Sequence, residues 1–239
     1  MLFNYCVKLQ YKGDNFLGFQ KCKEGMTIEG EIQPFLEKIL LHPVKIQATS
    51  RTDKGVHAEE QYINFFTNKE LDPITFIQKA NSSLPKEISF KTIEKKEFGF
   101  HPTLDVIKKR YRYQFSLKSI DHHLKISSYL DLEKIEAACD LLVGQHNFFS
   151  FCCKRKNYQD FFRTIHLASF VQEGDQYFFT VEGDQFLNKM VRMLACAMLL
   201  IGTKKMRIET FKTLLKEPII HPDIQPLSPN ALFLEKIFY

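Results

Sequence analysis

The chain has 239 residues, 44% of them hydrophobic and 26% charged, which is typical of a soluble globular protein with one large or two small domains. Its net charge of +5 permits binding to a polyanion without requiring it. The longest apolar run, residues 193–201, is too short to span a bilayer, and the N-terminus has no basic segment before an apolar core, so neither a membrane span nor a signal peptide is expected.

The first half of the chain mixes strand and helix patterns. Apolar residues recur at every second position over residues 5–11, which predicts a strand with one buried face. Thr27 can cap a helix over residues 28–39, and Pro34 inside it predicts a kink or a late start. The elements expected next are a loop at 51–58, a strand at 61–66, a helix from Asp72-Pro73 to just before Leu84-Pro85, a strand at 88–93 and a turn at 94–97.

The second half continues this mixture. Tyr111, Tyr113 and Phe115 alternate with Arg110 and Arg112, which is a strong strand signal. The elements expected after it are a helix from an Asp131 cap to Gly144, strands at 164–171 and 176–182 joined by a turn at 173–175, a long helix at 185–201 ended by Gly202, a short helix at 208–215 and a last strand at 231–239.

Strands interleaved with helices in both halves predict the α+β class. We expect two α+β lobes, residues 1–105 and 106–239, that share a mostly antiparallel sheet with helices packed on it.

The six cysteines follow no disulfide framework and include no Cys-x-x-Cys pair, which favours a reduced, cytoplasmic protein. Cys152 and Cys153 are adjacent, and adjacent cysteines rarely bind one tetrahedral ion. Because no second ligand pair follows them, no metal is expected.

The segment from Arg51 to Ala58, Arg-Thr-Asp-Lys-Gly-Val-His-Ala, is the most informative part of the chain. An aspartate before Lys-Gly is usually a turn former, because its side chain binds local backbone and glycine supplies a positive φ. Arg51, however, could keep the nearby Asp53 ionised, as a nucleophile or general base requires at neutral pH. Asp53 is therefore either a turn residue or a catalytic carboxylate.

Further motifs occur in order along the chain. They are Tyr11-Lys12-Gly13 followed by residues 16–20, then Asn81-Ser82-Ser83-Leu84-Pro85, Phe100-His101-Pro102, Arg110-Tyr111-Arg112-Tyr113, and Phe186-Leu187 with Met190-Val191-Arg192. Together with the Asp53 segment, which is similar to Gly-Arg-Thr-Asp-Ala-Gly-Val-His, they resemble the TruA-type tRNA pseudouridine synthases. These matches span nearly the whole chain, and their common order makes the resemblance specific.

The chain departs from the family pattern at four positions. Ser50 and Cys196 replace glycines, Lys54 replaces a small residue, and Thr103 stands where arginine is common. The aspartate, the tyrosine and the two arginines are kept, so the resemblance still implies activity. Thr103 leaves open how tightly RNA is held.

The resemblance implies a pseudouridine synthase-like fold with an active-site cleft between the lobes. It also implies that the protein is an isomerase that converts uridine to pseudouridine in the anticodon stem-loop of tRNA, around positions 38 to 40, without a cofactor. The family works as a homodimer, so a homodimer bound to tRNA is expected.

The resemblance also gives roles to four residues. Asp53 would attack the ribose C1′ or the uracil C6, or abstract a ribose proton, and the sequence leaves these choices open. Tyr111 would stack on the flipped uracil, whereas its strand pattern alone indicates an ordinary core residue. Arg192 would pair with Asp53, where the alternative is a surface arginine with a buried stem. Arg51 would bind RNA phosphate and help to open the target nucleotide.

Basic residues gather at 108–112, 154–156 and 204–207. One such cluster is more often a solvated face, but three clusters beside the motifs favour a surface that follows RNA phosphates. Candidate RNA contacts are Lys109, Arg110, Lys189 and His57, and we favour support of the Asp53 loop as the role of His57.

Two other functions use the same residues. A non-catalytic tRNA-binding module or chaperone would keep the basic clusters, but the joint presence of Asp53, Arg51, Tyr111 and Arg192 argues against it. A hydrolase with an aspartate nucleophile usually needs an added base or a metal, and no such group of residues is visible.

Overall fold

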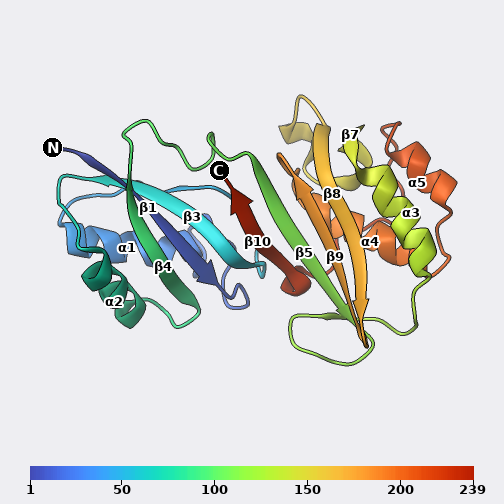
Figure 1. The fold of residues 1–239 in the computed structure, drawn as a ribbon, viewed down its shortest axis with the longest axis horizontal. Helices are drawn as coiled ribbons and strands as arrows, with labels where there is room; N and C mark the ends of the chain where they lie inside the picture. The colour runs from blue at the N-terminus through green and yellow to red at the C-terminus, as the bar shows by residue number, and fades with distance from the viewer. The chain divides into compact units, whose positions relative to one another are not determined.

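A computed structural model describes all 239 residues of the protein, which form two compact units (Figure 1). The first unit is Met1–Ile107 together with Phe233–Tyr239, and the second is Lys108–Leu232. Each unit combines mostly antiparallel strands with α-helices, so the predicted α+β class is confirmed.

The end of the chain belongs to the first unit. There β10 (Leu232–Phe238) pairs in parallel with β3 (His57–Thr67), with Phe233 opposite His57. The predicted lobes, divided at residue 105, assigned this last strand to the C-terminal lobe. Strand pairing, which is not visible in a local pattern, is the reason for the difference.

Within the first unit, β1 (Phe3–Tyr11) lies between β4 (Ile88–Lys96) and β3. The burial of Tyr5, Val7, Leu9 and Tyr11 agrees with the predicted period of two, because alternate side chains of a strand share one face. Asn4 and Cys6 on the opposite face are buried as well, so the prediction of a single buried face is wrong for the first half of the strand. The strand order is β4, β1, β3 and β10, with β2 (Gln47–Ala48) added to β3; all of these pairs except β3 with β10 are antiparallel.

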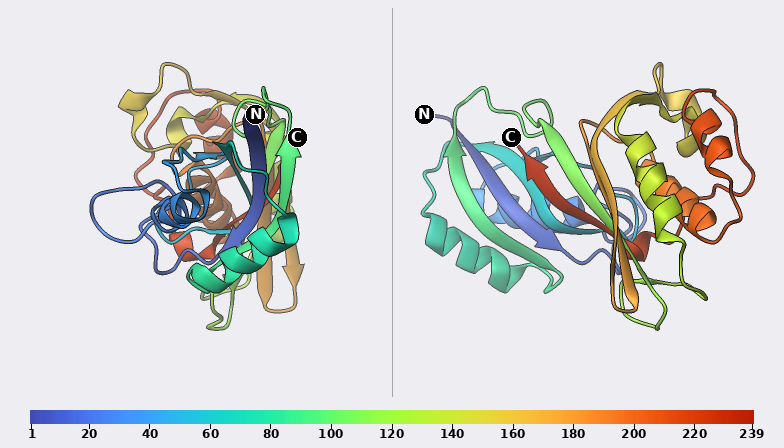
Figure 2. Two further views of the ribbon diagram at one scale, coloured as in Figure 1. Left: turned by 90° about the vertical axis from the view of Figure 1, so that its left-hand side faces the viewer. Right: turned by 45° about the vertical axis from the view of Figure 1, so that its right-hand side comes forward.

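Two helices pack on this sheet through phenylalanine rings. Phe35 of α1 (Ile28–Leu40) and Phe76 of α2 (Pro73–Ser83) contact each other and both contact Phe90 of β4, with ring centroids 6.1–6.2 Å apart. The two helices therefore share one face of the sheet, and Figure 2 shows α1 lying along it.

The first turns of both helices follow the sequence signals. The Thr27 hydroxyl accepts a hydrogen bond from the Gly30 N–H at 3.1 Å, and Asp72 accepts one from the Thr75 N–H at 2.9 Å. The late start predicted for α1 is wrong, because the helix begins at Ile28 and Pro34 lies inside it. Pro34 is exposed, so water can solvate the backbone carbonyl that it leaves without a helical partner.

The second unit contains five strands and three helices. Tyr113, Phe115, Tyr177 and Phe179 are fully buried in its core. The antiparallel strand order is β5 (Lys108–Ser116), β9 (Gln176–Gly183), β8 (Phe162–Glu173) and β7 (Gly144–Asn147), and β6 (Leu124–Lys125) pairs in parallel with β5. The helices are α3 (Leu132–Leu142), α4 (Met190–Gly202) and α5 (Ile208–Leu214), with 3-10 turns at Phe148–Phe151, Arg155–Asn157 and Pro229–Ala231.

Predicted boundaries are wrong at the end of β4, at the start of α4 and at the start of β3, which begins at His57 rather than at residue 61. The turn expected at residues 94–97 is largely strand, because β4 continues to Lys96 in register with β1. Helix α4 begins at Met190 rather than at residue 185, because Lys189 has the left-handed φ of 61° and cannot continue a helix toward the N-terminus. By contrast, helix α3 ends at Leu142 with Val143 as its C-cap, and Gly144 follows with a positive φ of 111°, as predicted for the glycine that closes the helix; the same residue begins β7.

The helices are short. The longest, α1 and α4, have 13 residues each, and no helix of the protein has the length and apolar character needed to cross a bilayer.

Candidate active site

Asp53 begins a tight turn in the first unit. The Val56 N–H donates a hydrogen bond to the Asp53 carbonyl at 3.2 Å, and Gly55 has the positive φ of 78° that such a turn needs. The side chain of Asp53 is half-buried, whereas Arg51 and Lys54 are exposed. The turn therefore keeps Asp53 at the edge of the core rather than inside it, and the two interpretations of Asp53 from sequence are compatible.

The loop that holds Asp53 packs directly on the segment that follows β1. A Cβ atom at Gly13 would lie 2.2 Å from the Val56 carbonyl oxygen, and one at Gly18 would lie 2.9 Å from that of Thr52. The Phe19 N–H also donates to the Thr52 carbonyl at 3.0 Å. The two glycines thus permit a backbone approach that no other residue allows, which gives a physical reason for the motif beginning at Tyr11.

Two buried polar side chains hold the same loop. The Tyr11 and Thr52 hydroxyls form a hydrogen bond of 2.7 Å, and Gln61 of β3 donates to the Ser50 carbonyl at 2.7 Å. The sequence prediction missed Gln61. Its signal was an amide at the start of the apolar strand predicted over residues 61–66.

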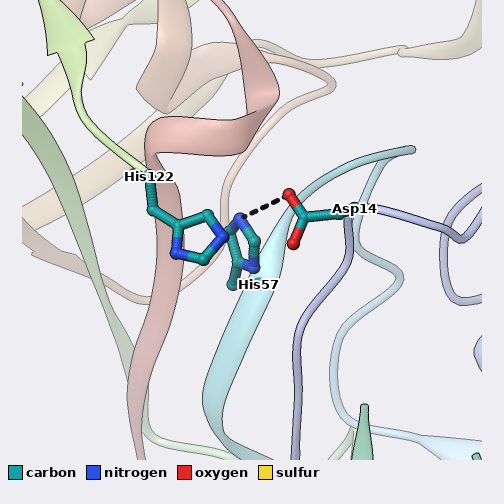
Figure 3. A group of neighbouring side chains, drawn as sticks. All are labelled: Asp14, His57 and His122. Atoms are coloured by element: carbon teal, nitrogen blue, oxygen red, sulfur yellow. Dashed lines mark ion pairs between the residues drawn. The ribbon is translucent and has the colours of Figure 1, made fainter. Parts of the chain in front are cut away.

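His57 ends the loop and is only 1% exposed. Its Nδ1 accepts a hydrogen bond from the Gly13 N–H at 3.1 Å, so the proton of the neutral ring is on Nε2. Nε2 lies 3.8 Å from an oxygen of Asp14, as Figure 3 shows, and the ring stacks on Phe233 at 4.6 Å. A histidine buried in this way favours support of the loop over contact with RNA.

Tyr111 lies on β5 of the second unit and is 8% exposed. The ring of Phe186 contacts it edge to face, with centroids 5.1 Å apart and an angle of 80°. This geometry fixes the plane of the tyrosine ring, as a stacking platform requires. Phe186 was part of a sequence motif, but no role had been predicted for it.

Arg192 lies in the first turn of α4 and is 8% exposed, so it is not a surface arginine. Its Nε donates to the Leu227 carbonyl at 2.6 Å, and the Tyr113 hydroxyl donates to the Ser228 carbonyl at 2.8 Å. Burial raises the pKa of Tyr113, and the nearby Arg192 charge opposes that rise. Arg192 and Tyr113 together hold the backbone of residues 227–228.

The basic residues of β5 point to opposite sides of the strand. Lys108 and Arg110 bind the buried carboxylate of Glu182 on β9, with the Arg110 Nε donating at 2.6 Å. Burial would raise the pKa of Glu182, but the hydrogen bonds from Lys108 and Arg110 lower it below its ordinary value. Arg110, a predicted RNA contact, is therefore already engaged in an ion cluster.

Lys109 shares the other side of β5 with Tyr111, because residues two apart in a strand face the same way. It is 9% exposed, and burial lowers the pKa of its ammonium group to about 8. Lys109 is therefore buried and loses its proton more readily than a solvated lysine does.

Lys189 precedes α4 in a left-handed conformation, which is strained for a residue with a Cβ atom. The adjacent Asn188 is held on both sides, since its N–H donates to the Tyr158 hydroxyl at 2.8 Å and its carbonyl accepts from the Cys153 N–H at 2.9 Å. Lys189 therefore lies next to the loop that carries the basic residues 154–156.

The predicted site residues are divided between the two units. Arg51, Asp53 and His57 share one loop of the first unit. In the second unit, Lys109, Arg110 and Tyr111 lie on β5, and Lys189 and Arg192 lie at the start of α4. That these residues act on one substrate stays a prediction.

A family model described as tRNA pseudouridine synthase matches residues 9–103 and 138–239. Relatives over nearly the whole chain include tRNA pseudouridine synthase A 2 of Protochlamydia amoebophila, 34% identical over 99% of this chain and 94% of its own length. The tRNA pseudouridine synthase A of Borreliella afzelii is 33% identical over 98% of both chains. That of Staphylococcus carnosus is 32% identical over 97% of this chain and 89% of its own.

Among solved structures, a chain of a Cbf5-Nop10-Gar1 complex gives a TM-score of 0.35 and 14% identity, covering 81% of this chain and 53% of its own. This likeness is too weak to carry an argument.

Proposed function

The chain belongs to the tRNA pseudouridine synthase family, and we propose that it converts uridine to pseudouridine in the anticodon stem-loop of tRNA, at positions 38 to 40, with Asp53 as the catalytic carboxylate. Members of the family are isomerases that act on tRNA. The observation that carries the finer proposal is the Asp53 turn, which is held by buried hydrogen bonds while its carboxylate stays partly exposed.

The reaction breaks the bond between N1 of uracil and C1′ of ribose and forms a bond between C5 and C1′. The hydrogen on C5 leaves as a proton, and N1 gains one, so no oxidant, reductant or cofactor is needed. Asp53 must be ionised for each of its three possible roles: attack at C1′, attack at C6, or removal of a ribose proton. A preformed turn holds the backbone of Asp53 in a fixed position before substrate binds, and such positioning of a reacting group lowers the entropic cost of the reaction.

Three further side chains complete the proposed site. Tyr111 is the platform for the uracil, and the edge contact from Phe186 supports that role because it fixes the ring plane. Arg192 is the proposed ion-pair partner of Asp53, and its burial suits a pairing role. Arg51, exposed on the loop, is proposed to bind RNA phosphate and to help open the target nucleotide.

We propose RNA contacts for Lys109 and Lys189 and a smaller one for Arg110. Arg110 keeps about a third of its side chain exposed but shares Glu182 with Lys108, so less of its charge is available to phosphate. His57 acts instead through the loop, as its burial and its bond from Gly13 support.

We also propose that the protein is a cytoplasmic homodimer. Its six cysteines form no disulfide, which suits a reducing compartment. Exposed apolar side chains, Phe98, Leu104 and Ile107 among them, offer surface for a subunit contact. Sedimentation equilibrium of the purified chain checks the dimer, and a monomer at micromolar concentration would contradict it.

Release of tritium from uracil C5 tests the reaction directly, because in the absence of a methyl donor isomerisation is the reaction that replaces that hydrogen with a bond to carbon. Unmodified tRNA labelled at C5 is the substrate. We expect release by the wild type, none by Asp53→Ala, and near-normal tRNA binding by that variant. Binding without release by the wild type would instead favour a tRNA-binding module or chaperone.

A matched substrate set locates the target. In each of three labelled tRNAs, one of the positions 38, 39 and 40 is uridine and the other two are not. A fourth labelled tRNA has no uridine at any of these three positions. Release from the fourth tRNA would contradict the anticodon stem-loop proposal while leaving the reaction class intact.

A further inference from the structure

We propose that Gln61 is a positioning residue for catalysis, and that its side chain fixes the backbone on both sides of Arg51 and so orients the Asp53 turn. The inference rests on the proposed function of that turn. Gln61 lies on β3 with no exposed surface, and no role for it follows from the chemistry described above.

The amide of Gln61 binds both backbone groups of one residue. Its Oε1 accepts from the Ser50 N–H at 3.2 Å, and its Nε2 donates to the Ser50 carbonyl at 2.7 Å. Because one end must accept and the other must donate, only one orientation of the amide satisfies both bonds. The two bonds therefore fix the rotation of the Ser50 peptide groups as well as their position.

This contact begins where backbone pairing ends. The ladder between β2 and β3 ends at Ala48 opposite Ile63, and the Thr49 N–H makes the last backbone bond, to the Tyr62 carbonyl at 3.0 Å. At Ser50, hydrogen bonds with the Gln61 side chain replace the backbone hydrogen bonds of the ladder. The chain can thus leave the sheet at a defined point without leaving buried backbone groups unbonded.

A second set of hydrogen bonds connects Gln61 to Thr52, on the other side of Arg51. The Gln61 Nε2 also lies 3.4 Å from the Tyr11 hydroxyl, which bonds the Thr52 hydroxyl at 2.7 Å. The Thr52 carbonyl in turn accepts from the Phe19 N–H at 3.0 Å. Ser50 and Thr52 are therefore both anchored, and Arg51 between them is exposed.

A purely structural role for Gln61 makes a different prediction from a positioning role. If Gln61 only satisfies buried groups, its loss lowers stability and reduces activity in proportion to the unfolded fraction. If it positions the loop, its loss reduces the rate of the folded enzyme, because a displacement of about 1 Å at a reacting group can cost on the order of 10²-fold in rate.

The matched variants are Gln61→Met and Asn64→Leu. Methionine keeps the length of the glutamine side chain but makes neither bond to Ser50. Asn64 is equally buried on β3, but its amide bonds Asn4 and the Phe100 carbonyl, away from the Asp53 loop. Both variants remove a buried side-chain amide from β3, but only Gln61→Met removes contacts to the Asp53 loop.

The first readout is the single-turnover rate of C5 tritium release, measured well below the unfolding temperature, beside the Kd for tRNA. We expect Gln61→Met to lower the rate by about 10²-fold with less than about a threefold change in Kd, since Arg51 is the only proposed tRNA contact that this loop displaces. Asn64→Leu should keep the wild-type rate. A Gln61→Met rate within twofold of wild type, or an equal fall in both variants, overturns the positioning role.

The second readout is independent of activity. A protease that cleaves only after arginine can cut between Arg51 and Thr52, and we expect the anchors on either side to protect this bond in the wild type. We expect fragment 1–51 to form at least tenfold faster in Gln61→Met than in the wild type or Asn64→Leu. Equal cleavage rates in the three proteins would overturn the inference, even if the enzyme is active. A wild type that releases no tritium would overturn the proposed function, but the cleavage rates would still test whether Gln61 holds the loop.

Discussion

At Tyr111 a ring and a hydroxyl group are available for two different tasks. The ring can stack on a base, and the hydroxyl can move the proton that leaves C5. Tyr111→Phe keeps the edge contact with Phe186 and removes only the hydroxyl. If the hydroxyl transfers the proton, single-turnover tritium release should fall by roughly 10²-fold or more, with Kd for tRNA unchanged.

The matched variant at this position is Tyr111→Ala, which removes the stacking surface as well. It should weaken substrate binding by about 1–3 kcal/mol in addition. A Tyr111→Phe enzyme with the wild-type rate would show that Tyr111 acts through its ring alone.

Lys109 gives a prediction about stability and pH. Burial lowers its pKa from 10.5 to about 8, so the folded protein binds this proton less tightly than the unfolded chain does. The resulting penalty on folding is full below pH 8 and disappears as the pH rises toward 10.5. Lys109→Met should therefore raise the free energy of unfolding at pH 7, by at most about 3 kcal/mol, and the advantage should vanish by pH 10.5.

Urea unfolding of wild type and Lys109→Met at pH 7, 8, 9 and 10.5 measures that difference. A gap that stays constant over this range would contradict the prediction, because it would show that the substitution acts through packing rather than through the buried charge.

Among the glycines, Gly13, which packs on the Asp53 turn, leaves the least room for an added Cβ atom. A methyl group at Gly13 would lie 2.2 Å from the Val56 carbonyl oxygen, and this oxygen is backbone and cannot rotate away. Gly13→Ala should therefore cost about 3 kcal/mol of stability and disturb the bond from Gly13 to His57. Gly99→Ala is the control, since nothing lies within 4 Å of its added Cβ.

Thermal and urea unfolding of the two glycine variants compare these costs. Gly13→Ala should also lose activity at temperatures where it remains folded, because the displaced turn carries Asp53. Equal stability of the two variants would show that the loop yields easily, and would weaken the claim that the turn is rigid.

Local patterns were sufficient to predict most elements, and the exceptions have identifiable causes. Thr27 and Asp72 mark helix starts because a cap is a contact over three residues. The left-handed Lys189 has no such local signal, so the start of α4 was predicted too early. Glu94 to Lys96 look like a turn because they are polar, but pairing with β1 makes them strand.

In the candidate site too, features with a local sequence signal were predicted and features that depend on the fold were not. The resemblance carried by the Asp53 segment, the Tyr111 strand and the Arg192 helix identified the family, and the relatives confirm it. The support of the loop could not be predicted, because Gly13 and His57 are 44 residues apart and meet only through the fold. Glu182, which engages Arg110, was equally invisible before the register of β5 with β9 was known.

At the scale of the whole chain, the first unit is completed by its last residues. The Ile237 N–H donates to Glu60 at 3.1 Å, and the Tyr239 hydroxyl donates to the Pro102 carbonyl at 3.1 Å. Phe233 stacks on His57 at the end of the Asp53 loop. The loop therefore depends on residues from both ends of the sequence, and a truncation at the C-terminus acts on the candidate site through His57.

The charge of the whole molecule leads to a last prediction. The net charge is only +5, so its distribution should decide how tRNA binds. Lys108 and Arg110 share Glu182, whereas Lys154 and Lys156 are exposed on the loop that contacts Asn188 beside α4. Replacing both Lys154 and Lys156 with alanine should raise Kd for tRNA and reduce the slope of log Kd against log salt by about 2.

The control is the double variant Lys79→Ala with Lys91→Ala, which removes two exposed lysines of the first unit and lowers the net charge by the same amount, from +5 to +3. If bulk charge alone governed binding, both double variants would weaken it equally. Titrations at several salt concentrations separate these cases, because a lost phosphate contact changes the slope whereas a weaker general field changes mainly the on-rate. Equal slopes in the two variants would mean that the 154–156 loop does not contact the RNA backbone.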